Sequence, residues 1–256
     1  MNGSLAILGL PHDASLQGGG TDHLIVAVHA LMFALFVGWL AFFLFVMFRF
    51  NQRRHPKADY EGVKSHASSY VEVIVALVEA VLLVGFAMPV WSRAVEKFPS
   101  EKDSTVIRVV AQQFQWNAWY PGKNGVFVKA DPKFISGDNT FGFDKSDPNY
   151  KSNFVVAKDF LVPVGKPVIA YISSLDVIHS FAVRPLRAMQ DAIPGMRIPV
   201  HFTPGEIGTY QINCAQLCGV SHFGMRGTIK VVSQADYDKW IAEKSKAGAS
   251  AGGGYE

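Results

Sequence analysis

An unbroken apolar stretch from Leu24 to Phe48 restricts the folds open to this chain more than any other feature. Its 25 residues contain one ionisable side chain, that of His29. A helix of this length exceeds the roughly 20 residues needed to span a bilayer. Helices buried in a soluble core seldom run so far without a polar face. The stretch therefore predicts a membrane-spanning helix.

A second apolar stretch runs from about Tyr70 to Trp91 and contains two acidic residues, Glu72 and Glu79. Taken alone, it is also compatible with a buried core helix, although a membrane span is favoured. Beside the first stretch, it predicts the return helix of a membrane hairpin. The two glutamates are seven positions apart, so they share one helix face at a separation of about 10 Å along the axis.

Basic residues between the two stretches set the expected orientation of the hairpin. Residues 49–68 carry five Lys and Arg, whereas residues 1–24 carry none. Because basic loops stay on the cytoplasmic side, both termini are expected on the periplasmic side of a bacterial inner membrane. The N-terminus lacks the cationic start of a cleavable signal, so we expect the first helix to be retained.

From about residue 105 the pattern changes to short β-rich runs separated by turn signals. In the fourth run, Tyr210, Ile212 and Cys214 share one face and polar residues share the other, as in a half-buried strand. This spacing predicts a β-sandwich. The runs are Thr105–Ala111, Pro167–Ser173, Arg197–Phe202, Gly208–Cys214 and Gly227–Val232.

The remaining segments complete the expected organisation. Residues 129–153 predict a long surface loop, 236–246 a short helix, and 247–254 a disordered tail. The net charge of +3, without a basic run interleaved with aromatic residues, argues against a nucleic-acid partner. The expected parts are an extracytoplasmic N-terminus (1–23), a hairpin (24–94, with helices at about 24–50 and 69–93 and a connector at 51–68), a β-domain (95–233), and a short helix with the tail (234–256).

A twelve-residue segment near the end of the β-domain gathers potential metal donors: Cys214, Cys218, His222 and Met225. Thiolate, imidazole and thioether groups suit copper better than calcium or magnesium. His179 lies 35 residues upstream at a strand end, from which a returning loop could bring it to the cluster. One cysteine would suit a mononuclear blue-copper site, whereas the second allows both sulfurs to bridge two metal ions.

Two other interpretations of the cysteines fit the segment less well. A local disulfide would leave the neighbouring His222 and Met225 without a role. A structural zinc site is a common use of two cysteines and two histidines, but its usual cysteine spacing and paired histidines are absent.

With these motifs, the chain resembles subunit II of haem–copper oxidases, whose dinuclear copper A centre lies in a cupredoxin domain. The resemblance covers the hairpin and the segments Gln113–Tyr120, Asp176–Ser180, Gln190–Arg197 and Cys214–Met225. It implies a membrane hairpin of two transmembrane helices followed by an all-β, cupredoxin-like Greek-key sandwich. The ligands that it implies for two copper ions are His179, Cys214, the main-chain oxygen of Gln216, Cys218, His222 and Met225.

The resemblance also implies roles around the centre. The tryptophan that accepts the electron in many members falls on Phe114, so Phe114 or Trp116 is expected to accept it here. Glu72 corresponds to a glutamate at the mouth of a proton-uptake path, while Glu79 falls where the family often has proline and takes no role from the resemblance. Residues expected to support the ligands or the subunit interface are Asp176, Asp191 and Arg197.

The implied function is electron transfer in a proton-translocating cytochrome c oxidase. Electrons from cytochrome c, or from another periplasmic haem donor, would pass through the copper centre to subunit I. That subunit would hold haem and a further copper, where oxygen becomes water; subunit III and membrane lipid are further expected partners.

Gln216 replaces the usual glutamate, and because a neutral amide is a poor magnesium ligand, a standard interface magnesium is not expected.

Two other functions are compatible with parts of the pattern. A quinol oxidase subunit II shares the architecture but lacks the copper ligands, all of which are present here. A membrane-tethered copper-delivery protein could share the ligands, but it would act without a haem-containing partner.

Overall fold

The computed structural model describes residues 8–58, 60–62 and 64–247, which divide into two compact units. The first unit contains the apolar helices. The second contains the β-rich part of the chain together with Leu10–Gly18, which precedes the first helix. The predicted disordered tail lies outside the described residues from position 248 onward.

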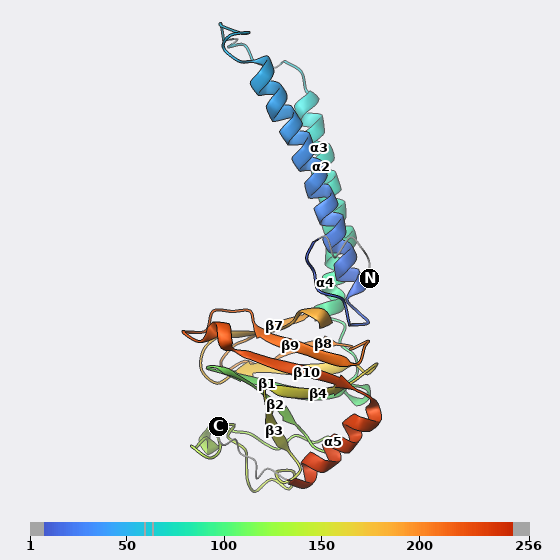
Figure 1. Cartoon of the computed structure of the whole chain (residues 1–256), viewed down its shortest axis with the longest axis vertical. Helices are drawn as coiled ribbons and strands as arrows, with labels where there is room; N and C mark the ends of the chain where they lie inside the picture. The colour runs from blue at the N-terminus through green and yellow to red at the C-terminus, as the bar shows by residue number, and fades with distance from the viewer. Residues whose placement is uncertain (1–7, 59, 63, 248–256) are drawn as a thin grey trace. The chain divides into compact units, whose positions relative to one another are not determined.

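The first unit is a pair of long helices (Figure 1). The large apolar side chains of these helices are exposed, as at Phe33 (70 %) and Leu83 (58 %). A core helix would be covered on at least one face, so these helices have the properties of membrane spans. The helical segments are α2 (Gly19–Arg49) and a continuous second helix made of α3 (Ala67–Val81), the π-helical η1 (Leu82–Ala87) and α4 (Met88–Val95).

The first helix begins at Gly19 rather than near the predicted Leu24. Its first turn contains Asp22, whose carboxylate complements the partial positive charge of a helix N-terminus. Apolar composition alone identifies only the membrane-spanning part of such a helix, so the prediction does not include the polar first turn.

The second unit forms two five-stranded sheets within residues 97–247, and this confirms the predicted all-β sandwich (Figure 1). The first sheet has the order β3-β2-β1-β5-β8 and the second β4-β10-β9-β6-β7. The pairs β1·β5 and β4·β10 are parallel. The strands are β1 (Thr105–Gln112), β2 (Gln115–Tyr120), β3 (Phe154–Ala157), β4 (Asp159–Pro163), β5 (Val168–Ser174), β6 (His179–Val183), β7 (Ala188–Ala192), β8 (Ile198–Phe202), β9 (Gly208–Cys214) and β10 (Arg226–Val232).

All five predicted runs are strands, and five further strands lie outside those runs. β6 is buried along its whole length, so it has no apolar–polar alternation to signal a strand. β3, β4 and β7 have only four or five residues each. The remaining elements are the 3₁₀ turns η2 (Glu101–Asp103), η3 (Pro132–Phe134), η4 (Arg184–Leu186) and η5 (His222–Gly224), and the helix α5 (Gln234–Ala247).

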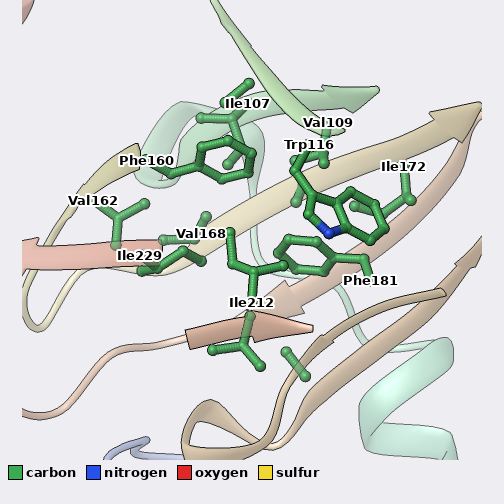
Figure 2. Close-up of a cluster of buried hydrophobic side chains, with 14 of the residues drawn as sticks. Ile107, Val109, Trp116, Phe160, Val162, Val168, Ile172, Phe181, Ile212 and Ile229 are labelled. Atoms are coloured by element: carbon green, nitrogen blue, oxygen red, sulfur yellow. The ribbon is translucent and has the colours of Figure 1, made fainter. Parts of the chain in front are cut away.

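The core of the sandwich is filled by side chains from both sheets (Figure 2). Trp116 of β2 meets Phe181 of β6 edge to face, with ring centroids 5.6 Å apart. Such aromatic pairs add to the free energy gained by burying their area. This contact ties the two sheets together beside the strand that begins at His179.

Two segments without regular structure pack on the sandwich. In Leu10–Gly18, the Ala14 amide donates a hydrogen bond to the Pro185 carbonyl (2.8 Å), and Ser15 pairs with Pro204. The predicted surface loop, 129–153, contains only the short turn η3 among the named elements, and its Phe143 packs on Trp119 of the first sheet.

Candidate metal centre

The loop between β9 and β10 closes on itself and holds most of the predicted ligands. These strands are antiparallel neighbours in which Asn213 pairs with Arg226. Cys214 and Met225 therefore stand opposite each other, and the Cys214 amide donates to the Met225 carbonyl at 3.3 Å. The rest of the loop folds over this closed end and includes Cys218 and the short turn that begins at His222.

The two cysteine sulfurs are close to each other and to two further donors of the same loop. Cys214 Sγ and Cys218 Sγ lie 3.7 Å apart, and both cysteines are free. A disulfide requires about 2 Å, so the local-disulfide interpretation does not hold for this structure. The carbonyl oxygen of Gln216 is 3.1 Å from Cys214 Sγ, and Met225 Sδ is 3.8 Å from Cys218 Sγ.

Two histidines reach the sulfur atoms from different elements. Because β6 pairs with β9, with Phe181 opposite Cys214, the first residue of β6 lies at the same end of the sheet. His179 Nδ1 is 3.1 Å from Met225 Sδ and 3.9 Å from Cys214 Sγ. His222 Nδ1 is 3.5 Å from Cys218 Sγ. The structure thus brings all six predicted donor groups into one linked cluster.

Asp176 orients the ring of His179. Its carboxylate lies 2.9 Å from His179 Nε2 and accepts a hydrogen bond from this nitrogen when it carries the ring proton. The lone pair of Nδ1 is then directed at the sulfurs. Burial acts to raise the pKa of Asp176, but hydrogen bonds from His179 and from the amides of Gln113 and Val177 hold it below its ordinary value. An ionised Asp176 is the partner that a metal-binding imidazole requires.

Burial, reinforced by the neighbouring Cys214, raises the pKa of the Cys218 thiol to about 11. This thiol therefore keeps its proton at neutral pH unless a cation displaces it, since a thiolate is the form that binds metals. His179 and Met225 are also almost fully buried, whereas Cys214 is half-buried and Gln216 exposed. The donor cluster opens to solvent on the Gln216 side.

The donor set fits copper. His179, Cys214 and Cys218 offer ligand atoms that all lie within 4.8 Å of one another. Two thiols and two imidazoles would satisfy tetrahedral zinc, but zinc would leave the Met225 thioether and the Gln216 carbonyl without a purpose in the same cluster. Five soft or borderline donors and one carbonyl oxygen, with the two sulfurs at the centre, would be enough to hold two copper ions.

The two residues predicted to accept electrons differ in burial, and the role of each stays a prediction. Trp116 has no exposed area and packs against His179 and Phe181, so it could take part only from beneath the surface. Phe114 is half-buried and lies against the metal-site loop, where a Cβ on Gly219 would come within 3.0 Å of its ring. Phe114 therefore stays a prediction for this role.

The other predicted residues lie outside the donor cluster. Asp191 of β7 is exposed and pairs with Ser180, the residue after His179. Arg197 is exposed and lines a different cavity. Glu72 and Glu79 lie on α3 with exposed side chains, and the proton-uptake role of Glu72 stays a prediction.

Gln113 is a further residue of this site and was not among the predicted ones. Its side-chain amide donates to the Cys218 carbonyl at 2.7 Å, and its backbone amide donates to Asp176 at 2.6 Å. Gln113 thus joins the metal-site loop to the carboxylate behind His179. Its position at the head of the segment Gln113–Tyr120 was the only available signal.

Comparison with known proteins identifies similar chains. Residues 105–232 match the family model of the cytochrome c oxidase subunit II periplasmic domain. An alternative cytochrome c oxidase subunit 2 from Bradyrhizobium diazoefficiens is 32 % identical over 218 residues, which cover 84 % of this chain and 77 % of that protein. A probable cytochrome c oxidase subunit 2 from Rickettsia bellii is 34 % identical, with coverages of 84 % and 75 %.

Solved structures include a similar domain. The periplasmic domain of cytochrome oxidase subunit II from Bradyrhizobium japonicum is 26 % identical to this chain, with a TM-score of 0.43. The match covers 59 % of this chain and 98 % of that one.

Proposed function

Because the chain belongs to the cytochrome c oxidase subunit II family of haem–copper oxidoreductases, we propose that it is the electron-accepting subunit of such an oxidase. It would take single electrons from cytochrome c, or from another periplasmic haem donor, and deliver them to haem in subunit I. There oxygen would be reduced to water with proton translocation. The observation that carries this proposal is the linked cluster of six donors around two free cysteines.

We assign the donors to two copper ions by their contacts. His179 and Met225, whose donor atoms are 3.1 Å apart, would bind one ion. His222 and the Gln216 carbonyl would bind the other, and Cys214 and Cys218 would contribute their thiolates to both. Two copper ions bound in this way supply one-electron redox chemistry.

The protein contributes a set of partly buried ligands that the sheet and hydrogen bonds hold in place. β6 and β9 hold His179 and Cys214 in one sheet, and the Cys218 carbonyl is tied to the Gln113 side chain. A frame whose ligands are held by second-layer hydrogen bonds changes little when the charge of the site changes. Little rearrangement is what fast single-electron transfer requires.

We propose that the membrane hairpin places the β-domain on the periplasmic side. The five basic residues of 49–68 favour a cytoplasmic connector. Residues Leu10–Gly18, directly before α2, pack on the β-domain, as expected if both ends of the hairpin lie on that side.

Copper analysis of the purified full-length chain tests the proposal. We expect two copper ions per chain and an EPR spectrum in which one unpaired electron couples to both nuclei. We also expect the native membrane assembly to contain haem together with this chain. A chain that binds copper but is recovered from the membrane without any haem-containing partner would favour the copper-delivery function instead.

Replacing Asp176 with asparagine is expected to weaken copper binding about 10- to 100-fold, the usual effect of losing a partner behind a ligand. The amide is neutral and has one acceptor oxygen, where the carboxylate receives His179 and the amides of Gln113 and Val177. Competition with a copper chelator measures the change. Asp103→Asn, in an exposed 3₁₀ turn, is the matched control, and equal affinities of the two variants would contradict the role of Asp176.

A further inference from the structure

A cavity of about 230 Å³ lies on the outer face of the first sheet and involves none of the proposed copper ligands. Strand register builds its floor, because Arg108 of β1 stands opposite Trp119 of β2 on one side and Tyr171 of β5 on the other. Residues 130–141 of the long loop form the opposite wall. The cavity is smaller than the pockets that take drug-sized molecules, so a ligand would have to be small.

Arg108 is the central charge of this cavity. Its guanidinium lies over the rings of Trp119 (4.4 Å) and Phe127 (4.2 Å). Within residues 8–58, 60–62 and 64–247, it has neither a hydrogen-bond acceptor nor a carboxylate at ion-pair distance. A half-buried cation with unsatisfied donors costs free energy that an anionic ligand would recover.

A second cation faces the same cavity. Burial, together with the positive charge of Arg197, lowers the pKa of Arg108 to about 10. The acidic groups nearby are engaged with other partners: Glu101 accepts a hydrogen bond from the Tyr171 hydroxyl, and Asp131 pairs with Lys133 at 3.2 Å. Both guanidinium groups thus line the cavity. Asp131 also lines it and Glu101 lies close enough to act on Arg108 through its charge, but neither carboxylate is at ion-pair distance from Arg108 within the described residues.

The rest of the lining is mainly apolar, which favours an anion with an apolar body. Ile135, Phe141 and Leu175 line the cavity together with Val110 and Pro132. We propose that this cavity binds a small organic carboxylate. The carboxylate of this ligand lies between Arg108 and Arg197, and the apolar body of the ligand packs against the loop wall. Guanidinium groups match a carboxylate in planar, paired hydrogen bonds, and the apolar wall selects against a bare inorganic anion.

Calorimetric titration of the purified, copper-loaded full-length chain tests this site with three probes. Benzoate presents a carboxylate on an apolar ring, benzyl alcohol presents a similar body without charge, and inorganic phosphate presents charge without the body. We expect saturable benzoate binding, weaker phosphate binding, and none for benzyl alcohol.

Single substitutions locate the binding. Arg197→Gln and Arg108→Gln are each expected to weaken benzoate binding about 10- to 100-fold, because each removes charge-assisted hydrogen bonds. Arg184→Gln removes the same charge from an exposed residue outside the cavity and is the matched control. An unchanged copper spectrum shows that each variant is folded. Should Arg108→Gln fail to fold, Arg197→Gln decides alone, since its side chain is exposed.

Three results would overturn the proposal. One is the absence of saturable benzoate binding, and another is benzoate affinity that is the same in Arg197→Gln and Arg184→Gln. The third is phosphate binding as tight as that of benzoate, which would mean that the apolar wall takes no part.

Discussion

Replacing Cys214 with serine is expected to abolish the paired copper centre and, with it, electron transfer into the oxidase. The proposed centre depends on the two sulfurs, which lie 3.7 Å apart and would both hold the metal ions. A serine hydroxyl is a hard and weakly acidic donor that does not replace a bridging thiolate. Copper content should fall from two ions per chain to at most one, and the EPR signal should report a single nucleus.

The matched control for this variant is Ala215→Ser. It adds the same hydroxyl one residue away, at an exposed position outside the proposed ligand set. Its copper content and spectrum should equal those of the unaltered chain. Cys218→Ser should fail like Cys214→Ser, because each sulfur contacts a different histidine, His222 and His179 respectively. A Cys214→Ser protein that kept both copper ions and full oxidase activity would refute the ligand assignment.

The donor cluster could be predicted largely because it is local. Cys214, Cys218, His222 and Met225 lie in one short loop, and copper preference follows from their chemistry. His179 joined the set through a family resemblance, since pairing between β6 and β9 is a tertiary property. The division of the donors that we propose for two ions could not be predicted at all. It rests on the 3.1 Å contact between His179 and Met225, which is set by sheet register.

Burial in β2 shows where pattern analysis fails. A strand of a sandwich usually alternates between a buried face and a solvent-exposed face, yet Trp116 and Trp119 of β2 are on opposite faces and both are buried. The long loop covers the outer face through Phe143 and so removes the alternation. For that reason, sequence could not tell a core tryptophan from a surface one. The same loop also lines the cavity that Arg108 and Arg197 share, so that cavity could not be predicted either.

Replacing Trp116 with alanine is expected to destabilise the β-domain by about 3–5 kcal/mol, the usual cost of deleting a buried tryptophan. The side chain is fully buried, and its neighbours, held in two sheets, can collapse only partly into the void. For a domain of this size, the loss corresponds to a fall in Tm of roughly 6–20 °C. Calorimetry of the purified chain measures the shift. Copper affinity should fall as well, because the indole packs against the ring of His179.

Trp116→Phe separates packing from the indole N–H. Among the residues that the structure describes, the Trp116 Nε1 donor has no hydrogen-bond partner. A buried, unpaired donor costs about 1–3 kcal/mol, so phenylalanine relieves that cost while it loses some volume. The net change in stability should be much smaller than for alanine, and copper binding should be retained. A loss as large as that of Trp116→Ala would contradict this interpretation.

Trp119→Phe is the matched comparison, because it makes the same substitution at a satisfied donor. Trp119 Nε1 donates to Asn153 Oδ1 at 2.8 Å, and its ring carries the guanidinium of Arg108. Phenylalanine at 119 removes a buried hydrogen bond of about 1 kcal/mol and weakens the cation–π contact, with no unpaired donor to relieve. We therefore expect Trp119→Phe to lower Tm more than Trp116→Phe does, although Trp116 is the more deeply buried of the two. The opposite order would mean that volume, rather than hydrogen-bond satisfaction, decides stability at both positions.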